Sequence, residues 1–204
     1  MLGAAALRGQ MVCLEPLRLE HAPDLARAAE GDRELYRWSP VPQGLAGAQA
    51  YISAALEWQA QGTAVPYAIV RSGEGVVGST RFWNIETWPA SADPLAASGP
   101  SVAEIGYSWL SAAMVRAGVN REAKLLMLTH AFEVWRALRI CFHTDVRNQR
   151  SRTALERLGA RFEGVLRVHR VAADGGPRDS ARYSISAAEW PDVKSALVAR
   201  LGTR

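Results

Sequence analysis

Residues 104–128, EIGYSWLSAAMVRAGVNREAKLLML, pass from an apolar, strand-like run through a short glycine turn into a strongly helical segment. Gly118, in the turn, allows a positive φ and a close approach of another group to the backbone. The helix that follows presents unpaired N–H groups and the positive end of its dipole. This order predicts a site for a phosphate or pyrophosphate. A plain left-handed turn before a helix is the alternative.

Two details of the turn narrow its chemistry. Arg116 and Arg121 add positive charge on either side of Gly118, and Asn120 either caps the helix or lies one position inside it. No G-K-[ST] follows the glycine and no G-x-G-x-x-G is present, so the stretch is neither a Walker A loop nor a dinucleotide-binding fingerprint.

Hydropathy and turn residues predict the strands and helices of the rest of the chain. Strands are predicted over residues 11–19, 66–71, 76–85, 102–110, 139–145, 161–170 and 182–186, and helices over residues 22–30, 46–59, 121–137, 149–158 and 187–201. Residues 87–101 hold three prolines and are expected to form a surface loop. Strands and helices alternate in the middle of the chain and hairpins flank them. We therefore predict a single mixed α/β domain over residues 1–204, with its core over residues 12–201.

Composition excludes several classes of protein. Of the 204 residues, 49% are hydrophobic and 22% are charged, and no apolar run approaches the ~20 residues that span a bilayer. Residues 1–10 are too short for a signal peptide, so we expect a frayed start and a cytoplasmic protein. The two cysteines and four histidines show no metal-ligand spacing, and no metal site is expected. A net charge of +4 without a Lys/Arg block suits an anionic ligand better than nucleic acid.

Several ordered motifs together resemble the GCN5-related N-acetyltransferase (GNAT) superfamily, in its RimJ/RimL-like branch. The similar stretches are EIGYSWL (104–110), NREAK (120–124), TDVRNQRSRTALERLGARFEG (144–164), LRVHR (166–170), PRDSARYSI (177–185) and EWPDVK (189–194). The likeness runs from about Val12 to Leu201. The acetyl-CoA loop of the family, Q/R-x-x-G-x-G/A, corresponds here to residues 115–120, where only Gly118 fits.

The resemblance implies a mixed, mostly antiparallel sheet whose fourth and fifth strands splay apart, flanked by helices. The pantetheine arm of acetyl-CoA would lie in the gap between these strands. The residues expected to bind this co-substrate are Leu110, Val115, Arg116, Ala117, Gly118, Val119, Asn120, Arg121, Asn148, Ser151 and Arg152. The spacing Asn148-x-x-Ser151 also fits a helix cap, which is the alternative for Asn148.

The family usually transfers the acetyl group directly in a ternary complex, without an acyl-enzyme. For the general base we favour Glu104, acting directly or through a water. Strand alternation predicts that residues 104, 106 and 108 share one face, and residues 105, 107 and 109 the other. The alternative for Glu104 is an ion pair with a neighbouring arginine. Many relatives use a tyrosine as the acid where this chain has Leu155. Ser151 is the substitute, as a hydroxyl that polarises the pantetheine sulfur.

An aromatic group of side chains suits a groove for a peptide end or an apolar amine, with simple core packing as the alternative. These candidates for acceptor binding are Tyr36, Trp38, Trp83, Asn84 and Tyr107. We therefore expect an acetyl-CoA-dependent N-acetyltransferase that modifies a primary amine, either a protein N-terminus or a small molecule. A non-catalytic acyl-CoA-binding or regulatory protein with the same fold is the alternative. No nucleic-acid or membrane partner is expected, and a homodimer is compatible with the sequence.

Overall fold

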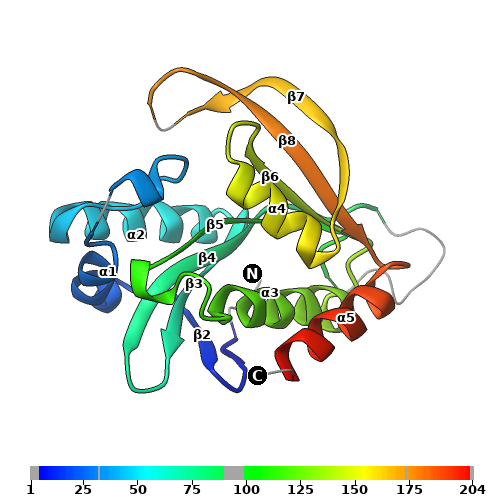
Figure 1. Cartoon of the computed structure of the whole chain (residues 1–204), viewed down its shortest axis with the longest axis horizontal. Coiled ribbons are helices and arrows are strands. Elements are labelled where there is room, and N and C mark those ends of the chain that lie inside the picture. Colours follow the sequence, from blue (N-terminus) through cyan, green and yellow to red (C-terminus); the bar gives the residue numbers. More distant parts are fainter. Residues whose placement is uncertain (1–4, 32, 90–98, 173, 203–204) are drawn as a thin grey trace.

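One mixed sheet forms the centre of the computed structural model, which describes residues 5–31, 33–89, 99–172 and 174–202 (Figure 1). Within those residues the sheet has eight strands in the order β1-β2-β3-β4-β5-β6-β8-β7. The strands are β1 (Leu7–Arg8), β2 (Val12–Pro16), β3 (Ala64–Arg71), β4 (Gly75–Glu86), β5 (Val102–Leu110), β6 (Arg139–Asp145), β7 (Arg161–Val171) and β8 (Pro177–Ser186). Neighbouring strands pair antiparallel, except that β5 and β6 are parallel.

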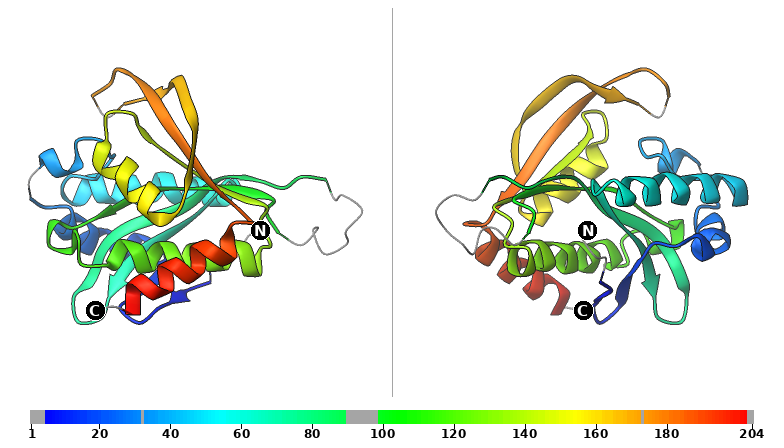
Figure 2. Two further views of the ribbon diagram at one scale, coloured as in Figure 1. Left: turned by 45° about the vertical axis from the view of Figure 1, so that its right-hand side comes forward. Right: turned by 180° about the vertical axis from the view of Figure 1, so that it is seen from behind.

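Helices cover both faces of this sheet. They are α1 (Ala22–Ala28), α2 (Gly44–Ala60), α3 (Val119–Thr129), α4 (Gln149–Leu158) and α5 (Trp190–Gly202). One hydrophobic core joins α3, α4 and α5 to the sheet, and a second core joins α1 and α2 to it. The β7–β8 hairpin rises beyond the helices in both views of Figure 2. The mixed, mostly antiparallel sheet with flanking helices confirms the predicted fold class.

Strand β3 shows why the sheet is covered on both sides. Val65, Tyr67 and Ile69 belong to the core on the α3 side, whereas Ala68 and Val70 pack toward α1 and α2. A strand buried on both faces reads as a continuous apolar run rather than an alternating one. The strand is predicted from the sequence at residues 66–71 and begins two residues earlier in the structure.

The first predicted strand was wrong at both of its ends. Residues 11–19 were expected as one strand, but β2 ends at Pro16, and Leu19–His21 forms a 3-10 turn. The Arg18 backbone N–H donates to His21 Nδ1 at 3.2 Å, which favours the turn over an extended strand. The expected frayed start was wrong for Leu7–Arg8, which pair with β2 as strand β1. Residues 1–4 lie outside the described part of the chain.

The predicted helix 121–137 is shorter and changes type. It starts at Val119, ends its α-helical part at Thr129 and continues as a π-helical turn over His130–Val134. This turn brings two aromatic rings into the core, since Phe132 stacks on Trp190 at 5.3 Å and Trp135 packs on Phe82 at 4.4 Å between ring centroids. A π-turn of this kind is not visible in a 3.6-residue period.

Two further boundaries differ from the predictions. Strand β8 begins at Pro177 rather than at residue 182, because Val171 of β7 pairs with Pro177, a strand-end position that proline tolerates. Helix α5 begins at Trp190 rather than at residue 187, since the Glu189 carboxylate accepts the Ser186 N–H at 2.8 Å and closes a turn there. Of the predicted loop 87–101, residues 90–98 lie outside the described part of the chain.

The Glu122 carboxylate joins α3 to the turn between β1 and β2. It accepts the backbone N–H groups of Gln10 at 2.6 Å, Met11 at 2.9 Å and Val12 at 3.0 Å. Glu122→Gln is expected to lower the free energy of unfolding by about 2 kcal/mol. The glutamine amide has one oxygen that can accept, and its NH2 group faces backbone N–H groups that the second carboxylate oxygen had satisfied. Urea denaturation measures this change.

Glu74→Gln is the matched control for this experiment. Glu74 lies in the β3–β4 turn, 2.8 Å from Arg71 Nη1, with its side chain 44% exposed. An exposed ion pair of this kind contributes about 0–1 kcal/mol, so the control should remain close to the parent. Equal losses in the two variants would contradict the role assigned to Glu122.

Candidate active site

Strands β5 and β6 separate soon after they begin to pair. They form three register pairs, Val102 with Arg139, Ala103 with Ile140 and Glu104 with Cys141. Beyond these pairs β5 continues to Leu110 and β6 to Asp145 with no further register pair in the described chain. Backbone N–H and C=O groups on the β6 side of β5 then need another partner. The predicted splay of the two strands is confirmed.

A β-bulge in β5 changes which side chains face the opening. Opposite β4, Arg81 pairs with Gly106 and Ser79 with Trp109, so β5 carries an extra residue there. Tyr107 accommodates it with a left-handed φ of 51°. A Cβ at position 106 would lie 2.6 Å from Trp83 Nε1, which explains the glycine.

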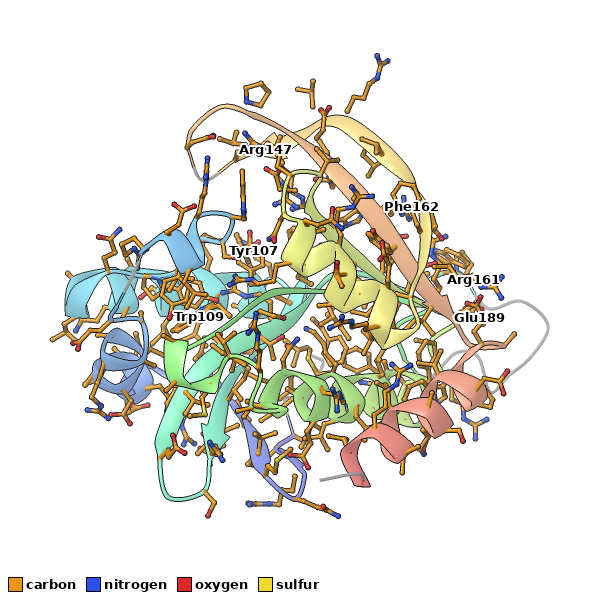
Figure 3. The ribbon with its side chains drawn as sticks, viewed as in Figure 1. Tyr107, Trp109, Arg147, Arg161, Phe162 and Glu189 are labelled. Atoms are coloured by element: carbon orange, nitrogen blue, oxygen red, sulfur yellow. The ribbon has the colours of Figure 1, made fainter. Side chains whose placement is uncertain are left out.

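The bulge makes the predicted alternation wrong after Gly106. The Tyr107 ring lies 5.5 Å from that of Trp58 in α2, and both Tyr107 and Trp109 lie toward α2 in Figure 3. The Trp83 indole, whose residue pairs with Glu104, lies 5.0 Å from Tyr107. Ser108 instead contacts Lys124 of α3 on the opposite face. Tyr107, not Ser108, therefore shares a face with Glu104.

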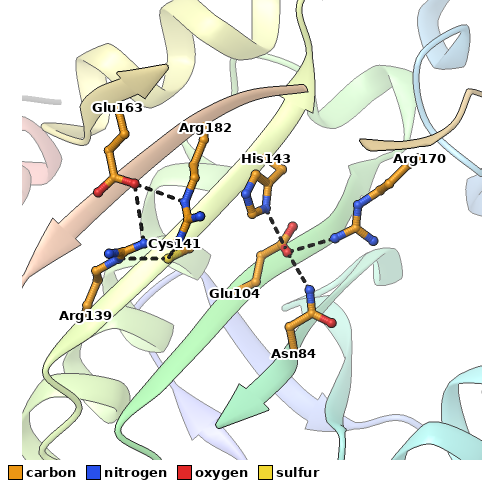
Figure 4. Close-up of polar contacts among 8 residues, drawn as sticks. All are labelled: Asn84, Glu104, Arg139, Cys141, His143, Glu163, Arg170 and Arg182. Atoms are coloured by element: carbon orange, nitrogen blue, oxygen red, sulfur yellow. Dashed lines mark hydrogen bonds and ion pairs between the residues drawn. The ribbon is translucent and has the colours of Figure 1, made fainter. Parts of the chain in front are cut away.

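Glu104 lies at the narrow end of the opening and has three polar neighbours (Figure 4). Its Oε2 atom lies 3.1 Å from Asn84 Nδ2, 2.9 Å from His143 Nδ1 and 3.2 Å from Arg170 Nη2. The residue is 3% exposed. A buried carboxylate needs such partners to remain charged. The arginine neighbour named as the alternative for Glu104 is thus present, together with a histidine and an amide.

Sequence reasoning missed His143 and Arg170. Parallel pairing of Glu104 with Cys141 places His143, two residues along β6, on the same side as Glu104. That register is a property of the folded sheet, which the sequence does not state. Arg170 comes from β7, and its guanidinium also lies 3.9 Å from the centroid of the Trp83 ring.

A second histidine stands beside this group. The ring centroids of His143 and His169 are 4.8 Å apart. Burial, and then the positive charge of Arg170, lower the pKa of His169 to about 4. His169 is therefore neutral at physiological pH, and it adds no charge next to Glu104.

The glycine turn has the predicted backbone form. Gly118 occupies the N-cap position of α3 with a φ of 85°, and the helix begins at Val119. Asn120 thus lies inside the first turn rather than at the cap. Arg116 is exposed and also left-handed, with a φ of 68°. Arg121 points away along the helix, since its Nη1 donates to the Arg200 carbonyl of α5 at 2.7 Å.

The remaining residues of the predicted loop are less exposed. Val115 and Ala117 are half-buried, and Val119 is fully buried in the core. At the end of β5, the Leu110 carbonyl accepts the Tyr36 hydroxyl at 3.1 Å. The chain from Leu110 to Gly118 thus links the open end of β5 to the N-terminus of α3.

The start of α4 is built around a capping residue. Buried Asn148 accepts the Ser151 backbone N–H at 3.0 Å, so the helix-cap alternative for Asn148 holds in this structure. Ser151 is half-buried in the first turn. Arg152 lies against the β7–β8 hairpin, with its Nε 3.2 Å from the Tyr183 hydroxyl and its guanidinium 5.7 Å from the Phe162 ring. Leu155 is buried.

The predicted acceptor-binding residues do not all lie together. Trp83, Asn84 and Tyr107 lie together beside Glu104. Tyr36 is buried against Trp109 near the other end of β5, at 6.2 Å between ring centroids. Trp38 contacts Arg147, whose guanidinium lies 4.5 Å from the centroid of the Trp38 ring.

Lys124 of α3 is the most buried lysine of the chain. It is 6% exposed, and its Nζ lies 2.5 Å from Ser108 Oγ and 3.5 Å from Thr80 Oγ1. Burial lowers the pKa of its amine to about 7. In the unfolded chain a lysine keeps its proton up to a pH of about 10, so the free energy of unfolding should rise with pH between these two values.

Comparison with Lys124→Met tests this linkage. Wild type should gain up to about 1.4 kcal/mol of unfolding free energy per pH unit over the variant between pH values of about 7 and 10. Urea denaturation across this range measures the slope. Lys194→Met is the control, since the Lys194 side chain is 40% exposed and pairs with Glu133 at 2.6 Å. If the free energy of unfolding depended on pH in the same way for wild type and Lys124→Met, the result would contradict a neutral buried amine.

The described residues contain neither a cluster suited to a metal ion nor a helix suited to crossing a membrane. No group of three or more His, Cys, Asp or Glu side chains in that part of the chain is arranged to hold a metal ion. None of the helices there combines the length and the apolar character that crossing a membrane requires.

Comparison with known proteins supports the interpretation of the fold. A model of the acetyltransferase (GNAT) domain matches residues 11–161. A solved acetyltransferase structure from T. thermophilus is 36% identical, with 98% of this chain and 99% of that chain covered and a TM-score of 0.79. A GCN5-related N-acetyltransferase from Brucella melitensis is 28% identical, with 97% and 85% covered and a TM-score of 0.82.

The structural matches also include a RimJ protein. Mycobacterium smegmatis RimJ, solved in complex with CoA-disulfide, is 26% identical over 93% of this chain and 88% of that chain, with a TM-score of 0.75. A search of curated proteins gave no match. The domain match, the splayed strands and these neighbours agree with one another. The chain belongs to the GNAT acetyltransferases, in their RimJ/RimL-like branch.

Proposed function

We propose that this protein transfers the acetyl group of acetyl-CoA to a primary amine by direct attack in a ternary complex. The observation that carries the proposal is the end of β5–β6 pairing at Glu104, with a buried carboxylate at one end of the opening and the N-terminus of α3 beyond the other. Leu110 lies six positions beyond Glu104, about 20 Å along an extended strand, so the opening is long enough for an extended arm to lie in it.

Each end of the opening has a separate role in this proposal. N–H groups in the first turn of α3, beside Gly118, would bind the pyrophosphate. Backbone groups of β5 beyond its pairing with β6 would bind the arm, as an added strand would be bound. The N–H groups next to the bulge would stabilise the oxyanion of the tetrahedral intermediate. Ser151 would polarise the sulfur as the thiolate leaves.

Glu104 would take the proton of the attacking amine, directly or through a water. Its three polar neighbours all contact Oε2, and Oε1 is the oxygen that we assign to proton transfer. The amine nitrogen attacks the thioester carbon, the C–S bond breaks, and the amide and free CoA thiol are the products. Asn84, His143 and Arg170 would hold the carboxylate in place.

Release of free thiol from acetyl-CoA, followed across a panel of primary amines, tests the proposal. The panel should contain short peptides with free N-termini and small amines, and calorimetry should measure CoA binding in parallel. Turnover with at least one amine is expected. Tight CoA binding without turnover would favour the non-catalytic acyl-CoA-binding alternative, and absence of both would reject the proposal.

A further inference from the structure

Positive charge exceeds negative charge around Glu104. Three guanidinium groups, those of Arg81, Arg170 and Arg178, are held in the described structure near the Tyr107 and Trp83 rings, among the carboxylates of Glu104 and Asp145. Of these only Arg170 forms an ion pair with Glu104, at 3.2 Å. The buried Asp145 carboxylate is already paired with Arg147 at 2.7 Å. The three guanidinium groups therefore face only the negative charge of Glu104, and a formal excess of two positive charges remains.

Arg170 and Arg178 lie directly opposite each other. They are register partners in the antiparallel β7–β8 hairpin. Like charges at such positions repel each other and destabilise the pair. Burial, and then Arg170, lower the pKa of Arg178. The Nε atoms of both residues are buried and have no hydrogen-bond partner among the described residues.

Arg81 on β4 is also a buried arginine with unsatisfied N–H groups. It is 1% exposed, and its Nε and Nη2 have no hydrogen-bond partner in the described structure. Its guanidinium lies over three aromatic rings, 4.2 Å from Tyr107, 4.8 Å from Tyr51 and 5.2 Å from Trp58. Cation–π contacts offset part of the burial cost but do not satisfy the N–H groups.

An anion between Arg170 and Arg178 would offset their repulsion and accept from their unsatisfied Nε–H groups. Its position is distinct from that of the CoA phosphates. The pyrophosphate is assigned to the N-terminus of α3, beyond Leu110, whereas the guanidinium groups lie around Glu104 and Tyr107. Guanidinium N–H groups match a carboxylate in a bidentate geometry. The neighbouring Glu104 would attract an ammonium group.

We propose that the acceptor carries a carboxylate close to its amine, with the carboxylate bound by Arg178 and Arg170 and the amine directed to Glu104. This inference rests on the proposed acetyltransferase function and adds a substrate class to it. A free amino acid and a peptide whose first residue is Asp or Glu both provide this chemistry. They are the two arms of the experiment.

The test compares matched acceptors on the wild-type protein. One arm uses free amino acids and their carboxamides, and the other uses peptides beginning with Asp or Glu and their Asn or Gln counterparts. In one of the arms kcat/KM should fall by about 10- to 100-fold when the carboxylate becomes an amide, as expected for a hydrogen bond to a charged group. If the carboxylate acceptor and its amide had equal kcat/KM values in each of the two arms, the inference would be overturned while the acetyltransferase function remained intact.

A variant then assigns the effect to the arginine pair. Arg178→Gln should remove most of the preference, so that kcat/KM for the carboxylate acceptor approaches kcat/KM for the amide acceptor of the same variant. Arg167→Gln, at an exposed position of the same β7 strand as Arg170, should keep the full preference. If Arg178→Gln kept the preference, the assigned site would be wrong.

A binding measurement separates this inference from the proposed function. Calorimetry of the N-acetylated carboxylate product and of its carboxamide, each with CoA present, does not require turnover. Stronger binding of the carboxylate product is expected. If CoA bound and neither product did, the inference would fail; if CoA did not bind at all, the proposed function would fail with it.

Discussion

Glu104→Gln should lower kcat by about 10²- to 10⁴-fold, the range that general base catalysis contributes. The amide retains an oxygen for Asn84, His143 and Arg170, so the fold and the CoA site should be preserved. It cannot accept the proton of the attacking amine. Steady-state thiol release measures kcat, and calorimetry should give an unchanged Kd for CoA.

Glu163→Gln is a matched control for that variant. Glu163 on β7 also lies between two arginines, 3.4 Å from Arg139 Nη2 and 3.0 Å from Arg182 Nε (Figure 4). It differs from Glu104 in lying outside the β5–β6 opening. The control should retain nearly the full kcat. Full activity of Glu104→Gln would remove Glu104 as the base, and an equal loss in both variants would reduce its role to structure.

Gly118→Trp should weaken CoA binding by about a hundredfold or more, because losing two charge-assisted hydrogen bonds has this effect on Kd. Gly118 has a φ of 85°, where a side chain is strained, and an indole there would stand over the first turn of α3. Calorimetric titration with CoA measures the change.

Gly73→Trp controls for backbone strain in this comparison. Gly73 has a φ of 80° in the β3–β4 turn, and a Cβ there would meet no atom within 4 Å. Both variants carry a similar conformational cost, but only Gly118 lies at α3. An unchanged Kd for Gly118→Trp would show that the pyrophosphate is bound elsewhere.

The order of elements could be predicted because local signals specify it. Apolar runs, turn residues and the Gly118 turn placed the starts of β5, α3, β6 and α4 within a few residues of their positions. The helix-cap alternative for Asn148 came from its spacing to Ser151, and the structure contains that cap. Such features depend on neighbours in the sequence, so the sequence alone shows them.

The detailed arrangement of the site could not be predicted, because it depends on contacts between distant segments. The bulge at Tyr107 reverses the facing of the rest of β5, and periodicity does not reveal one extra residue. The parallel register that places His143 beside Glu104 is likewise set by the folded sheet. Arg170 reaches Glu104 from a strand 66 residues away in the chain.

The most direct test of the central claim is a single-turnover reaction with acetyl-CoA that carries an isotope label in its acetyl group. The acceptor is an amine identified from the panel. For wild type, the account predicts that the label appears in the amide of the acceptor. For Glu104→Gln, it predicts that the label appears there much more slowly. The protein itself should stay unlabelled, because transfer is direct. Label that accumulated on Cys13, Cys141 or another residue before reaching the acceptor would contradict direct transfer, and label that stayed in acetyl-CoA would contradict catalysis.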